Sequence, residues 1–246
     1  NGRFKGQTIG SGTHVWKFDE DLKTGKMTQE ECNMAESCMS RSIGHCMTMG
    51  TASTMACMVE SLGLTLSGAA AIPAPDSRKK VLAQLSGRRI VEMVREDLTI
   101  DKILTKEAFE NAIKVNAAVG GSSNFLIHLI AIAGRMNIPL DLDEFDRLGS
   151  KIPLLLNLMP SGKFLMEDFF YAGGLPVILN ELKDHLHRNV ITVTGKNHHE
   201  NIKGNTECYN REVIASVSQP LIPEAGCVVV KGNLAPNGAV IKPSAA

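Results

Sequence analysis

The chain lacks two features that would assign it to common functional classes. It has no excess charge, because 26 Lys and Arg residues balance 26 Asp and Glu residues, and such a balance creates no global field that attracts nucleic acid or anionic membranes. It also has no long apolar run. The longest, from Phe125 to Ala133, has nine residues and contains His128, whereas a bilayer span needs about 20. We therefore expect neither nucleic acid nor a membrane as a partner.

An evident disulfide framework is also missing. Thiols persist in a reducing cytosol, whereas small secreted domains pair their cysteines. Several of the cysteines lie among methionines in helix-like or turn contexts, which suits a reducing compartment. We expect a cytoplasmic protein, or an organellar one in a eukaryote. The six cysteines are Cys32, Cys38, Cys46, Cys57, Cys208 and Cys227.

Periodicity and capping signals predict an α/β fold. Residues 1–27 are glycine-rich and polar, which is typical of a loop, with Trp16 as its anchor. The apolar runs 154–158 and 190–194 indicate buried strands. Alternation of such strands with helices favours a three-layer α/β/α domain with a mostly parallel sheet. Helices are expected from the capping box Thr28-Gln-Glu-Glu31, over 52–62, from Ser77, from Thr105 through Val115, and from Ser122 to about Gly134.

The sequence pattern changes near Gln219, from mostly helical segments to segments typical of strands. Two apolar segments, 227–231 and 239–242, predict strands that are joined through a turn at Pro236-Asn-Gly238. We therefore expect residues 1–218 to belong to one domain and residues 219–246 to begin another.

Cys46 is the first candidate for chemistry. It lies on a Gly/Ser-rich turn just before Gly50 and a predicted helix. Unpaired N–H groups and the positive end of the helix dipole stabilise a thiolate at such a position, which makes it a ready metal ligand or nucleophile. A buried structural cysteine is one alternative. A zinc site made with Cys32, Cys38 and His45 is another, although the spacings fit no compact zinc pattern.

The glycine pair Gly120-Gly121 and the residues that follow it form the second candidate. Successive N–H groups at a helix start can hold a carboxylate or phosphate, so Ser122, Ser123 and Asn124 are candidate substrate-binding residues. An ordinary helix cap is the alternative. His128, about a turn further on, could reach a pocket or be a hydrogen-bonded core histidine.

Three more residues have open roles. Arg41 and His45 flank Cys46 and could bring positive charge to its site, or be ordinary surface or capping residues. Lys163 follows a turn at Pro160-Ser-Gly162 and either contacts substrate or belongs to the turn alone.

Seven strings along the chain occur in the same order in a known family. On them the chain resembles the dihydroxy-acid dehydratase / phosphogluconate dehydratase family, most closely its sugar-acid (aldonate) branch, such as arabinonate and xylonate dehydratases. The strings are Gly10-Ser-Gly-Thr-His-Val-Trp16-Lys, Met39-Ser-Arg-Ser-Ile-Gly-His-Cys46 with the residues to Met55, Ala71-Ile-Pro-Ala-Pro-Asp-Ser-Arg78, Asn116-Ala-Ala-Val-Gly-Gly-Ser-Ser-Asn124, Asn157-Leu-Met-Pro-Ser-Gly-Lys163, Tyr171-Ala-Gly-Gly-Leu-Pro176 and Gly232-Asn-Leu-Ala-Pro-Asn-Gly-Ala-Val-Ile-Lys242.

The resemblance implies an iron–sulfur hydro-lyase. In similar enzymes the cysteine at the place of Cys46 is the third thiolate of a 2Fe–2S cluster with one open iron, and Mg²⁺ orients the substrate. The open iron acts as a Lewis acid on the C3 hydroxyl of a 2,3-dihydroxy acid while a base removes the C2 proton. The product is the 2-keto acid. Dihydroxy-acid dehydratase of branched-chain amino-acid synthesis is the alternative within the family.

The resemblance also implies that much of the enzyme lies outside this chain. Similar enzymes carry an upstream cysteine, a Cys-Asp-Lys motif with a second cysteine and Mg²⁺ ligands, and a downstream acidic ligand and base serine. No Cys-Asp-Lys occurs here. We therefore expect an internal fragment without a catalytic residue of its own, inactive alone, or a non-catalytic remnant. Residues 219–246 would begin a β-barrel-like domain, and the full-length protein would be a homodimer or homotetramer.

Overall fold

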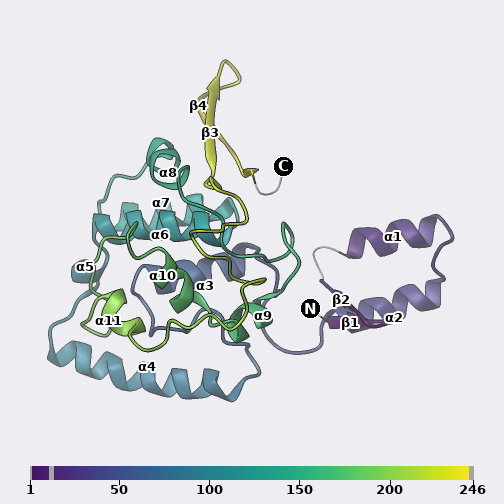
Figure 1. The fold of residues 1–246 in the computed structure, drawn as a ribbon, viewed down its shortest axis with the longest axis horizontal. Helices are drawn as coiled ribbons and strands as arrows, with labels where there is room; N and C mark the ends of the chain where they lie inside the picture. Colours follow the sequence, from purple (N-terminus) through teal and green to yellow (C-terminus); the bar gives the residue numbers. More distant parts are fainter. Residues whose placement is uncertain (1, 11–13, 244–246) are drawn as a thin grey trace.

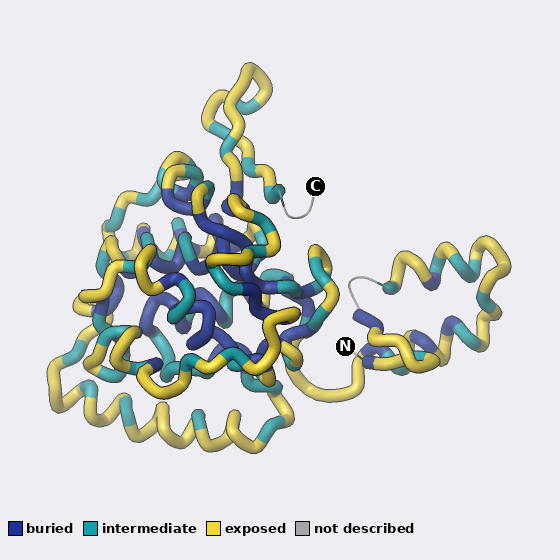
Figure 2. Tube along the Cα trace, in the orientation of Figure 1, coloured by how far each residue is buried: buried dark blue, intermediate teal, exposed yellow. Residues whose placement is uncertain are grey.

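A computed structural model describes residues 2–10 and 14–243 and divides the chain into an arm and a body (Figure 1). The arm comprises residues 2–39, and an extended segment joins it to the body (Figure 1). The arm and the body have separate clusters of buried apolar side chains, as the two dark regions of Figure 2 show. Helices and strands are mixed, as the sequence predicts. None of the helices in the described ranges has the length and apolar character of a membrane span.

The arm contains two short strands and two helices, which corrects the predicted loop over 1–27. Strands β1 (Gly2–Phe4) and β2 (Gln7–Ile9) form an antiparallel hairpin. Lys5 and Gly6 connect them, both with positive φ, as in tight two-residue hairpin turns. Helix α1 (Val15–Lys23) follows. Trp16 anchors nothing among the described residues, because it lies on α1 with 77% of its surface exposed.

Helix α2 (Gln29–Met39) completes the arm and begins where the sequence predicts. The Thr28 hydroxyl accepts from the Glu31 amide, and the Glu31 carboxylate accepts from the Thr28 amide, so the capping box is present. The helix turns its apolar stripe toward β1, β2 and α1. The core of the arm consists of Ile9, Phe18, Cys32, Ala35 and Met39.

The body is built around helix α6 (Lys106–Val119), in which ten of the fourteen residues are buried. Helices α3 (Thr51–Ser61) and α8 (Leu142–Gly149) pack against it. Helix α7 (Asn124–Arg135) places Phe125, Leu129 and Ala133 in the same core. The remaining short helices are α5 (Ile100–Ile103), α9 (Met166–Tyr171), α10 (Leu175–Glu181) and α11 (His198–Ile202).

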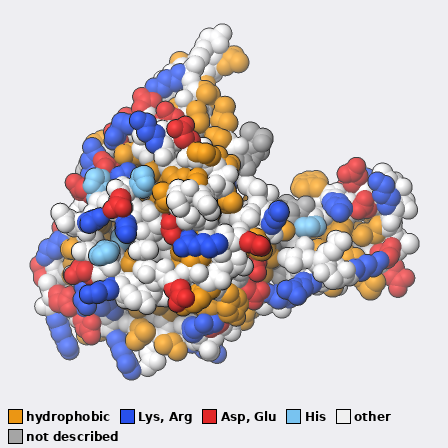
Figure 3. Space-filling view, in the orientation of Figure 1, with side chains coloured by type: hydrophobic (Ala, Val, Ile, Leu, Met, Phe, Trp, Pro, Cys, Tyr) orange, Lys and Arg blue, Asp and Glu red, His pale blue; other side chains and the backbone are white. Residues whose placement is uncertain are grey.

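Helix α4 (Ser77–Arg95) runs along one edge of the body (Figure 1) and has no buried residue. It starts one residue earlier than a Ser77 cap would require, because Asp76 is the N-cap and accepts from the Arg78 amide. It continues through Gly87 without a break. Charged side chains of both signs are interspersed over the face shown in Figure 3, in line with the balanced composition.

A mostly parallel sheet does not form among the described residues. Their strands make two sheets, each of two antiparallel strands. The run 154–158 is buried and extended, but it pairs only through isolated bridges, with Ile222 and Ile214 antiparallel and with Phe164 parallel. The run 190–194 makes one bridge, between Ile191 and Asn197. Burial therefore explains the apolar composition of the run 154–158 without a sheet, whereas only Val190 and Thr192 are buried in the run 190–194.

Strands β3 (Val228–Gly232) and β4 (Ala235–Ile241) form a hairpin that projects from the body (Figure 1). Both strands were expected, but the turn lies elsewhere. Gly232 pairs with Ala235, so the connection is at Asn233-Leu234, and the Pro236-Asn-Gly238 segment lies within β4. No closed barrel is present in the part of the chain that the structure describes.

The separate cores predict that the arm can open alone. Replacing Phe18 by Ala removes a ring that packs edge-on against Phe4, with centroids 6.1 Å apart, and such a change costs about 3–5 kcal/mol. Amide hydrogen exchange should lose protection over residues 2–39 and keep it over α6. Val15→Ala, at an exposed position of α1, is the control. Loss of protection in both parts would contradict the separation.

Substitution by alanine is expected to have opposite effects on stability at two glycines. A Cβ on Gly121 would lie 1.9 Å from Asn116 Oδ1 and 2.8 Å from the Thr54 methyl, so Gly121→Ala should destabilise the chain by about 1–3 kcal/mol. A Cβ on Gly87 meets open space within an exposed helix, so Gly87→Ala should stabilise it by about 0.5–1 kcal/mol. Urea unfolding measures both. Equal changes in the free energy of unfolding would show that Gly121 is not packed closely against Asn116 and Thr54.

Candidate active site

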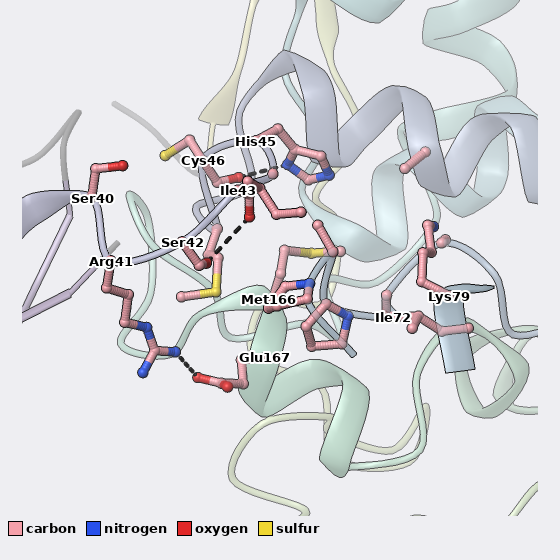
Figure 4. A pocket seen from close by; sticks show the side chains of 18 of the residues that line it. Ser40, Arg41, Ser42, Ile43, His45, Cys46, Ile72, Lys79, Met166 and Glu167 are labelled. Atoms are coloured by element: carbon pink, nitrogen blue, oxygen red, sulfur yellow. Dashed lines mark hydrogen bonds and ion pairs between the residues drawn. The ribbon is translucent and has the colours of Figure 1, made fainter. Parts of the chain in front are cut away.

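Cys46 lies on the wall of a cavity of about 660 Å³. One side is the segment that links the arm to the body, and Figure 4 shows Ile72 and Lys79 across from it. Met166 and Glu167, from the start of α9, form the floor between them (Figure 4). The main lining residues are Met39 through Met47, Ala56, Ala70 through Pro75, Lys79, Met166 and Glu167.

The Cys46 thiol is partly buried and lies beside a hydroxyl. Its Sγ is 3.1 Å from Oγ1 of the buried Thr48, which can donate to a thiolate. The Cys46 carbonyl accepts from His45 Nδ1 at 2.8 Å and from the Ser53 hydroxyl at 3.2 Å. Both bonds restrain the carbonyl of the residue that carries the sulfur.

The loop 46–50 is irregular, and its backbone is held by a second loop. The Met166 amide donates to the Met47 carbonyl at 2.8 Å, and the Met49 amide donates to the Met159 carbonyl at 2.7 Å. Ser53, in the first turn of α3, also donates to the Thr48 carbonyl at 2.7 Å. The position of Cys46 is therefore set by α3 and by the 157–166 loop together.

The charged side chains in the cavity differ in their partners. Arg41 forms an ion pair with Glu167 (Figure 4). Lys79 donates to the Ala69 carbonyl at 3.2 Å and makes no ion pair with a described residue. His45 is exposed and is occupied with the Cys46 carbonyl. The sequence suggested Arg41 and His45 as sources of positive charge, whereas the structure adds Lys79.

The predicted substrate residues Ser122, Ser123 and Asn124 do not line this cavity. They lie at the N-terminal end of α3, where Asn124 Nδ2 donates to Thr51 Oγ1 at 2.7 Å. The Ser122 amide donates to Thr54 Oγ1 at 2.9 Å. The first turn of α3 thus links this loop to the Cys46 loop. Helix α7 starts at Asn124 rather than Ser122, with Ser123 as its N-cap but without a side-chain cap bond.

The other candidate residues lie apart from the cavity. His128 is exposed on α7 and is neither a core histidine nor a lining residue. Lys163 is exposed at the tip of the 157–166 loop, where its amide donates to Asn157 Oδ1. For the zinc alternative, Cys32 is buried in the core of the arm. No cluster of three or more His, Cys, Asp or Glu side chains suitable for a metal ion occurs among residues 2–10 and 14–243.

The sequence analysis missed one wall of the cavity. Ala71 through Pro75 stood out only as a string, without a structural role, and Lys79 and Glu167 did not stand out at all. Alanines and prolines give no chemical signal, but the pair Pro73 and Pro75 breaks helix periodicity. That pattern indicates a fixed loop between two helices, which is what the wall is.

The side chains at the site decide whether it could hold the cluster and the Mg²⁺ that the sequence suggested. Cys46 fits the role of one thiolate ligand, because its sulfur is partly buried, lies on a cavity and has a hydroxyl neighbour. The acidic side chain that lines the cavity, Glu167, is engaged by Arg41. The described residues therefore offer a cluster one ligand and offer Mg²⁺ no ligand set. None of the six cysteines, all of which are described, forms a disulfide.

Comparison with known proteins gives similar relatives over almost the whole chain. It is 58% identical over 248 residues to an L-arabinonate dehydratase of Rhizobium leguminosarum bv. trifolii, covering 100% of this chain and 43% of that protein. It is 44% identical over 236 residues to a D-xylonate dehydratase of Caulobacter vibrioides (95% and 39%). It is 43% identical over 244 residues to a dihydroxy-acid dehydratase of Thermodesulfovibrio yellowstonii (99% and 44%). The chain spans less than half the length of these curated relatives.

A family model agrees with these relatives. The family described as dihydroxy-acid/6-phosphogluconate dehydratase, N-terminal, matches residues 2–201. The match includes the Cys46 loop, the cavity walls and the Gly120–Asn124 loop. It confirms the resemblance carried by the strings in the sequence. The chain belongs to the dihydroxy-acid/6-phosphogluconate dehydratase family.

Proposed function

We propose that this chain is part of a hydro-lyase that converts a sugar acid, such as an aldonate, to its 2-keto-3-deoxy acid. The observation that carries the proposal is the 58% identity to an L-arabinonate dehydratase across the whole chain. The position of Cys46 on a cavity large enough for a small organic acid supports it.

The proposed role of Cys46 is to hold one iron of a 2Fe–2S cluster. When bound, such a cluster supplies a Lewis acid that helps a poor hydroxyl leaving group depart. Thr48 would donate a hydrogen bond to the thiolate, and Ser53 and His45 would keep the Cys46 backbone in place. The other thiolates, the Mg²⁺ ligands and the serine base would come from outside the described residues.

Ser122, Ser123 and Asn124 are proposed to contact substrate from the N-terminal end of α3. Their hydroxyl and amide groups suit the hydroxyls of a sugar acid. Because Thr51 already binds Asn124, the loop is preorganised beside the Cys46 loop.

The whole protein is proposed to have more of the fold than this chain does. Its first domain would include residues 1–218, and strands from elsewhere would complete a mostly parallel sheet along the extended runs 154–158 and 190–194. A β-barrel-like domain would begin at 219. The projecting hairpin β3–β4, with Val228, Val230 and Ile241 exposed, supports this because such strands normally pair or pack. We propose a cytoplasmic homodimer or homotetramer.

Dihydroxy-acid dehydratase of branched-chain amino-acid synthesis is the second candidate, favoured by the 43% identity to such a protein. The lower identity makes the sugar acid the first choice. A non-catalytic remnant is the third, since the described residues hold one cluster ligand.

The test uses a protein of the relatives' length that contains this chain. After anaerobic reconstitution with iron and sulfide, we expect a visible Fe–S absorption and 2-keto acid formation from L-arabinonate or D-xylonate. Cys46→Ser should remove the absorption and lower turnover by about 100-fold or more, because the cluster loses a thiolate that binds its iron directly. Cys208→Ser, at another partly buried thiol, is the matched control.

Other results would change the assignment. Turnover of a branched 2,3-dihydroxy acid in preference to the sugar acids would favour the second candidate. Full activity in Cys46→Ser would refute the proposed role of the thiol. No turnover of either class in a protein with an intact cluster would support the remnant.

A further inference from the structure

Glu60 is a buried carboxylate that holds a turn of the backbone. It lies near the C-terminal end of α3 with 1% of its surface exposed. Its Oε1 accepts from the Gly68 amide at 2.6 Å, and its Oε2 accepts from the Ala70 amide at 2.8 Å. A buried carboxylate is costly unless both oxygens are satisfied, and here the turn satisfies them.

Lys79 holds the same turn from the opposite side. From the first turns of α4 it donates to the carbonyl of Ala69, the residue between the two amides that Glu60 binds. Three successive residues are thus bound by two side chains of opposite charge from two helices. Gly68 has a φ of +81°, so the turn itself is one that suits glycine.

The turn leads directly into the cavity wall. Ala70 through Pro75 and Lys79 itself line the cavity across from Cys46 (Figure 4). Ala69, Ala70 and Ala71 are buried, so small side chains provide little packing of their own. The three hydrogen bonds from Glu60 and Lys79 therefore restrain the place where this wall begins, in addition to the packing of Ala70 and Ala71 in the core.

We propose that Glu60 and Lys79 are positioning residues that together fix the 68–75 wall of the Cys46 cavity, and that protonation of Glu60 loosens this wall. The consequence for substrate rests on the proposed function, but the restraint on the wall does not.

The groups around Glu60 determine the pH at which its carboxyl group ionises. Burial raises the pKa of Glu60 to about 7, while the Ala70 and Gly68 amides and the charge of Lys79 act in the opposite direction. Cys57, one turn earlier on α3, faces it as a neutral thiol, because burial and the Glu60 charge raise the pKa of that thiol. The ionised carboxylate accepts both amides with charge-assisted bonds. A protonated carboxyl group carries no charge and its hydroxyl oxygen is a weaker acceptor, so both bonds weaken and one of them weakens most.

The test follows backbone amides of the chain by NMR between pH 5.5 and 8.5. We expect the Gly68 and Ala70 amide proton shifts to move together with a midpoint near 7, since ionisation strengthens both bonds. The Ile72 and Ala74 amides, which Glu60 does not bind, should follow the same transition if the wall responds. Absence of a transition at Gly68 and Ala70, or a transition confined to these two residues, would overturn the proposal.

Three variants sharpen the result. Glu60→Gln should abolish the transition at all four amides. Lys79→Met should raise the midpoint by roughly 0.5 unit, because a cation that favours the ionised carboxylate is lost. Lys80→Met, at the exposed neighbouring position, should leave it unchanged. A transition that persists in Glu60→Gln would show that another group causes it. If that variant fails to fold, the titrations of the wild-type chain and of the two lysine variants still test whether Glu60 is the group that ionises. No cluster or substrate is needed, so this result is independent of the dehydratase assay.

Discussion

The packing of α3 on the buried helix α6 is the constraint on which the site depends. Helix α6 presents small side chains such as Ala112 and Ala118, so its neighbours approach closely. Since α3 rests on this rigid support, its two ends are fixed points for the irregular loops around it.

The chemistry is placed on loops, and the loops take their geometry from backbone hydrogen bonds. The Cys46 loop has no regular structure, yet it is bound by the Ser53 hydroxyl, the Met159 carbonyl and the Met166 amide. Buried backbone groups need such partners, and a loop that satisfies them through two separate segments has little freedom. The thiol is thereby held at the cavity without belonging to a helix or strand.

The sequence predicted helices better than strands, for a physical reason. Caps are local: Thr28 and Thr105 bind amides three residues away, so the pattern contains the contact. The run 154–158 is apolar because it is buried, and burial alone does not say whether its neighbour is a strand or a helix. The hairpin turn was misplaced for a related reason. Gly238 has a φ of +107°, as a turn glycine would, but it lies within β4.

The residues of the site also differ in whether the sequence alone could identify them. Cys46 could be found from its motif, whereas Glu60 could not, because a glutamate in a helix is usually a surface residue and its partners are backbone amides that carry no sequence signal. The position of Glu60 on α3 nevertheless shows how the two sides of the cavity are held. The first turn of α3 holds the Cys46 loop through Ser53 and the Asn124 loop through Thr51. Its last turn holds the opposite wall through Glu60. One helix of eleven residues therefore contributes to both sides, together with the 157–166 loop on the Cys46 side and Lys79 of α4 on the other.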